Sequence, residues 1–538
     1  MTEELKVQPF LRKSTGLVKE IGPIGSFVIP WASMAGSGIS VYAVEVVYNY
    51  PQGNVALAFL LVGIPVIFSV VTFAMLGMTT PRAAGAYVWA ARFVDPFVGW
   101  FGTGWIYFLS TLFSLGLIGY IMGDLFPVIF AMMGHALGIP ALTAFSIAMG
   151  TNATMEDALI IATIVIVGLL ALVEIKHFMK VLIVVWALNL LGLIVSFALF
   201  AVYTPSTIPA AWNSFWGAGS YEMITSLATK YNLAGYVAST TQGFWNDTLS
   251  IVAYIFWALV GYELNAYMGG EVRNPRSSFL YWYTAGAVAT VIWYVVLSWL
   301  TYNAYGNFIL QYNYVYNLFT AGKLAANETA AVAPYMLLPS MPLFAASLGG
   351  TPIVEFLAAW WFFPITALLI SYMGTTRTAF GLSFDRMFPA IFGKVSDRTH
   401  TPIEATVMAI IGAVVVATLD FTAYGFLVSA ANTSFFIAFV YLIVAFTAII
   451  LPYKRPDIWE KGLRKKIFGL PEMTLFGLLA AVGMFWILAL STVGISILAW
   501  NLTILYILIG VVVFAFFVVR NEKKGIKLMD IYGEIPPP

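Results

Sequence analysis

The stretch FWALVGYELNAYMGGEVRNP, residues 256–275, decides how the rest of the chain is interpreted. It begins inside an apolar run of membrane-spanning length, which Gly261 and the carboxylate Glu263 interrupt near its middle. A charge at the bilayer centre costs at least about 2.5–3.5 kcal/mol, so a lipid-facing helix is not expected to carry Glu263. Non-helical backbone at that depth is tolerated only where protein or a water-filled cavity surrounds it. The stretch therefore predicts a broken transmembrane helix that lines a polar cavity.

The composition of the 538 residues indicates an integral membrane protein. Hydrophobic residues make up 61% of the chain and charged residues only 9%, with a mean hydropathy of +0.89. Soluble proteins carry about 25% charged residues, so most of this chain is expected to lie in lipid. Cysteine is absent, which excludes disulfides, thiolate catalysis and cysteine-ligated metals. The polar N-terminal segment has no cleavable signal, so the first apolar stretch is expected to serve as both targeting signal and mature helix.

Twelve apolar runs of about 20 residues are long enough to span a bilayer. With the N-terminus in the cytoplasm, 24 of the 26 Lys and Arg residues fall on the cytoplasmic side, and only Lys230 and Lys323 lie outside. This asymmetry is typical of a correct helix count, and it predicts cytoplasmic N- and C-termini in the cell membrane. The predicted spans lie near residues 22–48, 55–78, 97–130, 157–174, 178–203, 247–271, 278–303, 353–387, 403–420, 422–451, 473–494 and 496–519.

The two long outer loops, 204–246 and about 304–352, are expected to contain short surface helices or a lid, because they exceed the length of tight connections. Three N-x-T sequons fall on the predicted outside, at Asn152, Asn246 and Asn327, and either glycosylation or chance explains them.

The predicted segments are the cytoplasmic N-terminus (1–21), helices 1–5 (22–203), the first outer loop, helices 6–10 (247–451), a basic cytoplasmic loop (452–472), helices 11 and 12 (473–519) and a cytoplasmic tail (520–538).

A second interruption lies in the first predicted span, at Gly36-Ser37-Gly38. Each glycine weakens a helix by roughly 1 kcal/mol and permits close backbone approach. Taken alone, the motif is equally typical of a small-residue packing face. However, five spans separate the first helix from the sixth, so the two halves are inverted relative to each other. Interrupted helices at corresponding positions of inverted halves indicate a transporter binding site.

Four motifs follow one another along the chain: GSGI (36–39), PRAAGAYVWAARFVDPFVGWFGTGWIYF (81–108), EVRNPRSSF (271–279) and GTTRTAFGLSFDRMFPAIFGKVSDRTHTPIEA (374–405). Together they resemble the motifs of the amino acid–polyamine–organocation (APC) permease superfamily. The resemblance covers helices 1 to 9 and implies the LeuT-type fold, a 5+5 inverted repeat with discontinuous helices 1 and 6, plus two C-terminal helices. It also implies a secondary transporter of amino acids that works by alternating access. Thr376 and the run Phe384-Asp385-Arg386 depart from the family pattern.

An amino acid is a zwitterion, so its site needs opposite charges close together. The free N–H groups that begin the second half of helix 1 suit the carboxylate. The free carbonyls that end the first halves of helices 1 and 6 suit the ammonium. Family members often place an aromatic lid at the position of Trp257, although a buried or lipid-facing tryptophan explains it equally. The predicted substrate-binding residues are Ala35, Gly36, Ser37, Gly38, Ile39, Trp257, Ala258, Gly261, Tyr262 and Asn265, with Tyr107 as a further cavity candidate.

Glu263 is the candidate for coupling transport to protons, because burial and nearby charges can tune a carboxyl group to exchange protons near neutral pH. The alternative is a glutamate that stays hydrogen-bonded to the broken helix. A sodium site would need oxygen ligands, which Ser371 and carbonyls near Ala35 can supply. The candidates for a cytoplasmic gate are Glu271, Arg273, Arg377 and Asp385.

An enzyme is not expected, because the predicted spans lack HExxH, GxSxG, cysteine and histidine. A channel, a nutrient sensor and a transporter of polyamines or other organic cations remain alternatives on the same fold. A polyamine site calls for several cavity carboxylates, whereas the sequence places only Glu263 there. We expect no cofactor and no nucleic-acid partner, a small-molecule substrate in a lipid environment, and either H⁺ or Na⁺ as the coupling ion of a monomer or homodimer.

Overall fold

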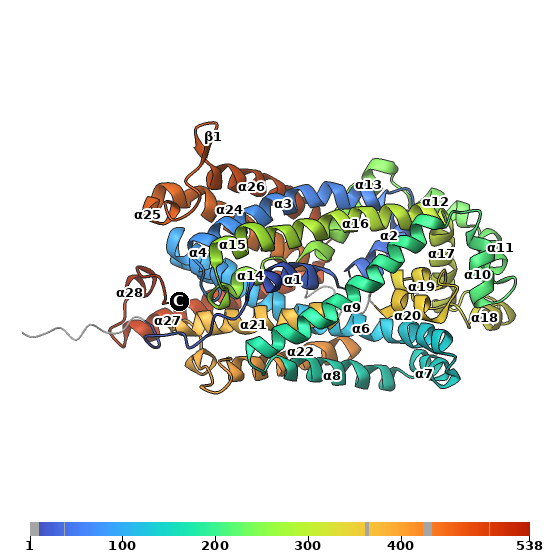
Figure 1. The fold of residues 1–538 in the computed structure, drawn as a ribbon, viewed down its shortest axis with the longest axis horizontal. Helices are drawn as coiled ribbons and strands as arrows, with labels where there is room; N and C mark the ends of the chain where they lie inside the picture. Colours follow the sequence, from blue (N-terminus) through green and yellow to red (C-terminus); the bar gives the residue numbers. More distant parts are fainter. Residues whose placement is uncertain (1–9, 37, 361–364, 423–432, 494, 538) are drawn as a thin grey trace, which may run out of the picture.

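The computed structural model describes residues 10–36, 38–360, 365–422, 433–493 and 495–537. Most of this part of the chain is helical, and its long helices run along a common axis (Figure 1). The one sheet among these residues is a two-stranded hairpin of β1 (Lys466–Ile467) and β2 (Leu470–Pro471). The protein is an all-α polytopic membrane protein, in agreement with its composition.

Within the described residues, ten helical stretches are long and apolar enough to cross a membrane, or eleven if one bent pair counts as a single span. The predicted span 403–420 is present as α22 (Ile403–Thr422), but its apolar part is shorter than a full span. The predicted start of the span 422–451 lies outside the described residues. The number twelve therefore stays a prediction.

Each stretch that could span the membrane consists of one helix or of several helical pieces in succession. These stretches are Val55–Thr79 (α3), Pro96–Leu137 (α5 Pro96–Val98, η2 Gly99–Ile106 and α6 Tyr107–Leu137), Ala153–Leu170 (α8), Ile175–Val202 (α9), Phe244–Tyr267 (α13 Phe244–Ile255, η3 Phe256–Leu259 and α14 Leu264–Tyr267), Pro275–Tyr305 (α15 Pro275–Ser277, η5 Ser278–Tyr283 and α16 Thr284–Tyr305), Pro352–Phe384 (α20 Pro352–Trp360 and α21 Ile365–Phe384), Ser434–Lys454 within α24 (Thr433–Lys454), Glu472–Ser491 (α26) and Ile497–Glu522 (α27). The bent pair is α1 (Pro23–Met34) with η1 (Gly38–Tyr42) and α2 (Ala43–Asn49).

The first and sixth spans lie inside the helix bundle. α1 packs against α9, α16 and α21, and α14 packs against α1 and α21. By contrast, α8, α9 and α27 leave most of their surface uncovered by protein. Lipid therefore contacts the outer helices, whereas protein surrounds the interrupted ones.

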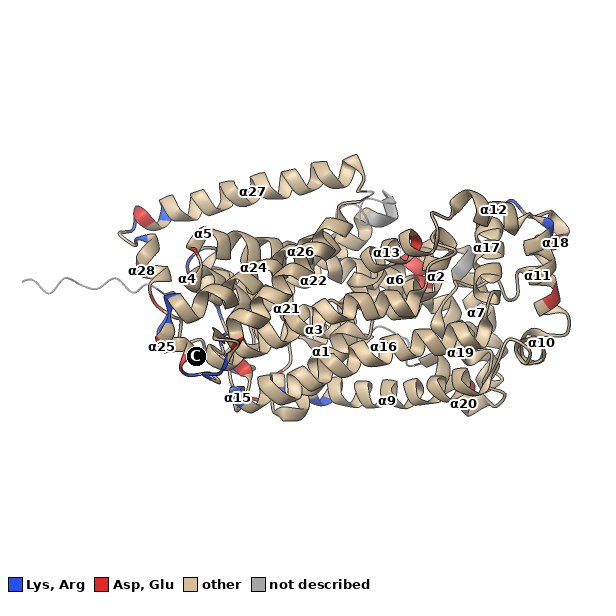
Figure 2. Ribbon diagram, turned by 90° about the horizontal axis from the view of Figure 1, so that it is seen from above, with Lys and Arg blue, Asp and Glu red and all other residues tan. Residues whose placement is uncertain are grey.

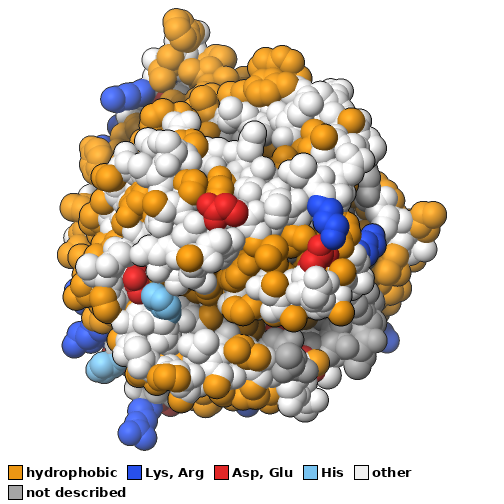
Figure 3. All heavy atoms as spheres, turned by 90° about the vertical axis from the view of Figure 1, so that its right-hand side faces the viewer, with side chains coloured by type: hydrophobic (Ala, Val, Ile, Leu, Met, Phe, Trp, Pro, Cys, Tyr) orange, Lys and Arg blue, Asp and Glu red, His pale blue; other side chains and the backbone are white. Residues whose placement is uncertain are grey.

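Six short helices occupy the two long outer segments and form a cap over one end of the bundle (Figure 1). Lys230 and Glu328 join the two segments, with 2.5 Å between Nζ and Oε1, and the Tyr231 hydroxyl donates to Glu328 at 2.7 Å. These hydrogen bonds lower the pKa of Glu328. Figure 3 shows this end of the molecule, where the few charged side chains lie among hydrophobic and uncharged atoms. The cap helices are α10 (Ile208–Trp216), α11 (Ser220–Lys230), α12 (Leu233–Thr240), α17 (Phe308–Thr320), α18 (Ala326–Val332) and α19 (Met341–Ala346).

Both predicted helix interruptions are present. α1 ends at Met34 and helical structure resumes at Gly38, with a bend of 46° between the halves. In the sixth span, α13 tightens into the 3₁₀ turn η3, and helical structure resumes only at Leu264. Gly261, between these pieces, has a φ of +118°, which residues with a side chain rarely adopt.

Replacing Gly261 by alanine is expected to destabilise the protein by about 2–4 kcal/mol, the sum of backbone strain and overpacking. An alanine Cβ there would lie 2.9 Å from the Ser33 Cβ, which is closer than packed side chains allow. Thermal unfolding of the purified protein measures the effect. Gly322→Ala is the matched control, because Gly322 also has a positive φ but nothing lies within 4 Å of its position for a Cβ. Equal melting temperatures for the two variants would contradict the overpacking at Gly261.

Candidate functional site

A cavity of about 50 Å³ lies where the two interrupted spans meet. The breaks are more than 200 residues apart in sequence, yet both contribute to its wall, and α6, α21 and α24 complete it. The lining residues are Ser33, Met34, Gly36, Gly38, Thr111, Ser114, Ile118, Trp257, Ala258, Val260, Gly261, Glu263, Leu264, Ala367, Ser371 and Ile437.

The two breaks touch through their backbones. A Cβ on Gly38 would lie 2.5 Å from the Cα of Ala258, so only glycine permits this approach. The Ser33 hydroxyl donates to the carbonyl oxygen of Gly261 at 2.8 Å and so links the two breaks directly. The Tyr294 hydroxyl of α16 donates to the carbonyl of Met34 at 2.6 Å, which satisfies one carbonyl at the end of α1. Helix-terminal groups that would be costly in lipid are thus paired or face the cavity.

Glu263 is 2% exposed and accepts three hydrogen bonds. The Tyr107 hydroxyl donates to Oε1 at 3.1 Å, whereas the Tyr441 hydroxyl and the Gly261 N–H, at 3.0 Å, both reach Oε2. The carboxylate therefore connects the break in the sixth span to α6 and α24. No Lys, Arg or His among the described residues pairs with it.

The structure divides the predicted substrate-binding residues into two groups. Gly36, Gly38, Trp257, Ala258 and Gly261 line the cavity, together with Glu263. Ala35, Ile39, Tyr262 and Asn265 lie beside the breaks without lining it, and Ser37 lies outside the described residues.

Tyr262 and Asn265 differ in their surroundings. The Tyr262 hydroxyl donates to Ser69 of α3 at 2.8 Å, which directs this side chain away from the cavity. Asn265 is fully buried, and neither of its side-chain polar atoms has a hydrogen-bond partner among the described residues. Unsatisfied buried amide groups are rare, so Asn265 stays a candidate for contact with a bound molecule.

Ser371 lines the cavity, but its hydroxyl donates to the Ala367 carbonyl of its own helix at 2.7 Å, and Ala35 does not line the cavity. The sodium site at these residues remains a prediction. Among the described residues, no group of three His, Asp or Glu side chains is placed to hold a metal ion.

Tyr441 and Ser33 are functional candidates that the sequence reasoning missed. Tyr441 lies within the apolar helix α24, and its hydroxyl identifies it only once Glu263 is found opposite. Ser33 lies directly before the first break, where a hydroxyl could have been recognised as a partner for unpaired backbone groups.

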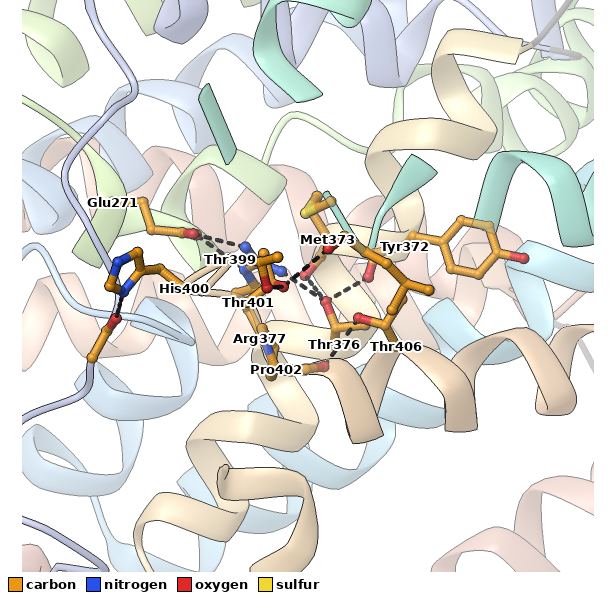
Figure 4. Close-up of polar contacts among 12 residues, drawn as sticks. Glu271, Tyr372, Met373, Thr376, Arg377, Thr399, His400, Thr401, Pro402 and Thr406 are labelled. Atoms are coloured by element: carbon orange, nitrogen blue, oxygen red, sulfur yellow. Dashed lines mark hydrogen bonds and ion pairs between the residues drawn. The ribbon is translucent and has the colours of Figure 1, made fainter. Parts of the chain in front are cut away.

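The cytoplasmic-gate candidates Glu271 and Arg377 form a fully buried ion pair with two parallel hydrogen bonds (Figure 4). Nη2 of Arg377 lies 2.7 Å from Oε1, and Nε lies 3.0 Å from Oε2. Such bidentate pairs are strong and geometrically specific. The pair joins the end of the sixth span to α21, below the cavity.

The other two gate candidates, Asp385 and Arg273, do not join this pair and have other partners. Asp385 pairs with Arg92 of α4 (Gly85–Phe93) instead, at 2.7 and 2.8 Å, and also accepts from the Tyr87 hydroxyl at 2.6 Å. Burial opposes the charge on Arg92, but the adjacent Asp385 carboxylate raises the pKa of this guanidinium overall. Arg273 pairs with Glu20 near the surface. Asp385 follows the end of α21, so α4 is its neighbour rather than the sixth span.

The described N-terminal segment crosses the same region. The Leu11 N–H donates to the Phe384 carbonyl at 3.0 Å, at the end of α21. Further along, the N–H groups of Glu20 and Ile21 donate to the Glu271 carbonyl at 3.0 and 2.9 Å. The segment therefore bridges the two sides of the Glu271–Arg377 pair.

The C-terminal segment covers the Arg92–Asp385 pair. In α28 (Leu528–Tyr532), the Tyr532 hydroxyl lies 2.9 Å from that of Tyr87, and its ring lies 4.9 Å from the Arg92 guanidinium. Arg82 donates to the Pro536 carbonyl at 2.6 Å. Both ends of the described chain thus lie over the end of the bundle that carries the Glu271–Arg377 and Arg92–Asp385 pairs.

A larger cavity of about 700 Å³ lies on the opposite side of Trp257, toward the cap. Trp257 lines both cavities, and its ring packs on Tyr42 with 5.4 Å between centroids. The molecule is therefore hollow toward the cap and closed toward the end that carries the ion pairs.

Comparison with known proteins gives one family and two distant relatives. The family model described as amino acid permease matches residues 21–514. The vacuolar cationic amino acid transporter 2 of Arabidopsis thaliana is 24% identical over 423 residues, which cover 78% of this chain and 58% of that protein. The vacuolar cationic amino acid transporter 4 of the same plant is 21% identical over 451 residues, which cover 82% and 64%. The chain therefore matches less than two thirds of the length of these curated relatives.

Glu271→Ala is expected to destabilise the protein by about 3–5 kcal/mol, because it leaves Arg377 charged and unpaired in the interior. Thermal unfolding of the purified protein measures the effect. The control is Asp457→Ala, which breaks the exposed pair with Arg455 and should cost about 0–1 kcal/mol. Similar small effects for both variants would show that the buried pair does not stabilise this conformation.

Proposed function

This chain belongs to the amino acid permease family, and we propose that it is a secondary transporter that carries amino acids across the cell membrane by alternating access. The proposal includes the twelve-helix, 5+5 inverted-repeat architecture, with both termini in the cytoplasm. The concentration of Lys and Arg at one end of the bundle supports this orientation (Figure 2). Transport needs no cofactor in this scheme.

The observation that carries the proposal is the cavity between the two helix breaks. The helix that starts at Gly38 directs N–H groups and the positive end of its dipole toward the substrate carboxylate. Carbonyls at the end of η3, near Ala258, are placed for the ammonium group. The glycines leave this backbone uncovered, so a small zwitterion can contact it directly.

The two closures on either side of the cavity support alternating access. Trp257 separates the central cavity from the larger, outer cavity toward the cap, and the Glu271–Arg377 pair closes the cytoplasmic path. Release to the cytoplasm requires this pair to separate, whereas entry from outside requires Trp257 to move. Alternation between these two events is the transport cycle that we propose.

A cationic amino acid is the substrate that we favour within this class. Both relatives carry cationic amino acid transporter in their names. Polyamines are the second candidate, but the central cavity has only one carboxylate, Glu263, among its lining residues. A polyamine has no carboxylate for the helix start at Gly38.

Uptake of labelled amino acids into proteoliposomes tests the proposal. We expect saturable uptake that speeds up when the vesicles are preloaded with the same amino acid, which a channel would not show. Gly38→Leu should abolish uptake and binding, because a side chain there overlaps Ala258 and covers the helix start. Gly22→Leu is the control, since Gly22 has open space around its position for a Cβ and an ordinary φ of −85°. Undiminished affinity in Gly38→Leu would show that the carboxylate binds elsewhere.

We further propose that Glu263 carries the coupling proton. Ionised, it accepts from the Gly261 N–H and two tyrosines, whereas a proton on Oε2 must displace at least one donor from that oxygen. Protonation thereby loosens the link between the break and α24.

Glu263→Gln should abolish accumulation driven by a pH gradient while exchange continues, and Glu222→Gln, at an exposed carboxylate of α11, should leave both unchanged. Normal pH-driven accumulation in Glu263→Gln would remove the proton role.

A further inference from the structure

A short hairpin in the connection between α24 and α26 projects from the side of the bundle. Its strands β1 and β2 pair Lys466 with Pro471 and Ile467 with Leu470. In Figure 1 the hairpin points away from the outer helix α26, across the common axis of the long helices. α26 begins at Glu472, directly after β2, and it is one of the helices long and apolar enough to cross the membrane. The hairpin is therefore joined without a linker to the end of a span.

The hairpin lies at the level where the spans end. Phe468 lies four residues before Glu472, and four residues of extended chain reach at most about 14 Å. The loop before the hairpin lies against the end of α3, because a Cβ on Gly462 would be 3.1 Å from Cγ2 of Thr79, the last residue of that helix. The headgroup region is about 5–8 Å deep on each side of the hydrocarbon core. A hairpin that projects sideways at this level lies against lipid headgroups.

The tip of the hairpin combines an exposed aromatic ring with an unfavourable backbone conformation. Phe468 is 95% exposed, and its φ is +52°, whereas Gly469 after it has a φ of +80°. Two-residue hairpin loops with both φ angles positive usually carry Asn or Asp before the glycine, because bulky side chains rarely adopt the left-handed conformation. The turn itself therefore does not explain a phenylalanine at this position. Contact with an apolar phase would remove its ring from water.

Basic side chains precede this tip. Residues 460–471 carry four Lys and Arg residues and one acidic residue, Glu460. Arg464, Lys465 and Lys466 are exposed, and none of them forms an ion pair within the described residues. Nε of Arg464 donates to the carbonyl of Glu460, which leaves the rest of the guanidinium available. Each cation close to an anionic lipid surface strengthens attachment by about fivefold.

From its position, its exposed ring and its cations, we propose that the hairpin of residues 464–470 is a binding site for anionic phospholipids. Phe468 inserts among the acyl chains, whereas Arg464, Lys465 and Lys466 bind the phosphates and anionic headgroups of the same leaflet. The hairpin thus combines apolar burial with electrostatic attraction, the two contributions that determine binding at a membrane interface. The inference is independent of the proposed transport function, because it concerns the connection between α24 and α26 rather than either cavity.

The position of the tip can be tested with a single label, because the chain contains no cysteine. Phe468→Cys is labelled with a small fluorophore in the full-length protein and reconstituted into nanodiscs of equal parts phosphatidylcholine and phosphatidylglycerol. Spin-labelled lipids should quench this fluorophore by about twofold or more, since the tip lies at headgroup depth, and iodide in the water should not quench it. Glu222→Cys, at an exposed position of the cap helix α11, is the control and should show the opposite pattern. A label at residue 468 that lipid does not quench, whether water or another protein surrounds it, would overturn the inference.

The preference for anionic lipid is measured by native mass spectrometry of the purified full-length protein, with phosphatidylglycerol or phosphatidylcholine added. The wild type should retain phosphatidylglycerol preferentially. The triple variant Arg464→Gln/Lys465→Gln/Lys466→Gln should lower this preference by about tenfold or more. The control has the same change in charge and should keep the preference, because it replaces three exposed cations outside the hairpin, in Lys13→Gln/Lys19→Gln/Arg398→Gln.

Phe468→Asn separates the role of the ring from that of the turn. Asparagine tolerates a positive φ, so the hairpin should stay folded, while retention of phosphatidylglycerol should fall by about threefold or more because the apolar ring is lost. Unchanged retention in this variant or in the triple hairpin variant would overturn the inference. Equal retention of both lipids by the wild type, or the same loss of preference in the control, would also overturn it.

Discussion

Backbone polar groups without partners cannot face lipid, and this constraint determines where the two interrupted spans lie. At the breaks the chain stops forming its own i to i−4 hydrogen bonds, so other partners must be close. Ser33 supplies one for Gly261, Tyr294 supplies one for Met34, and Glu263 accepts from the Gly261 N–H. Each of these partners lies within the bundle, so the remaining helices have to enclose the breaks. The cavity follows from the same requirement, because it is the place where the breaks meet.

The two cavities share Trp257 but differ in their linings. The central cavity is bordered largely by backbone and small side chains, which suit the groups common to every amino acid. The larger cavity toward the cap is bordered by bulkier side chains, among them Tyr42, Tyr254 and Trp257. Trp257 belongs to both walls, so movement of this one side chain changes both cavities together.

The sequence predicted the features that have local signals. Gly261 and Glu263 stand out because a glycine and a carboxylate interrupt an apolar run, and the outer segments stand out by their length. The partners of these residues could not be predicted in the same way. Tyr441 lies in an unremarkable apolar helix, and it becomes significant only because folding places it opposite Glu263.

The pairing of Asp385 shows the same limit. Arg377 and Asp385 are close in sequence, but the direction of each side chain from the end of α21 decides its partner. One points toward the end of the sixth span and the other toward α4.

Both ends of the described chain are attached to the end of the bundle that carries the Glu271–Arg377 pair, and this has a practical consequence for how the protein is handled. Residues 11–21 and 532–536 contact the surface around the ion pairs of this end, which separates in the transport cycle that we propose. A purification tag or fluorescent protein fused close to either end is therefore attached to a part of the molecule that moves in the proposed cycle. In the same cycle, each separation of the Glu271–Arg377 pair would change the energy transfer between two dyes placed near the two chain ends. No label inside the membrane is needed for this measurement.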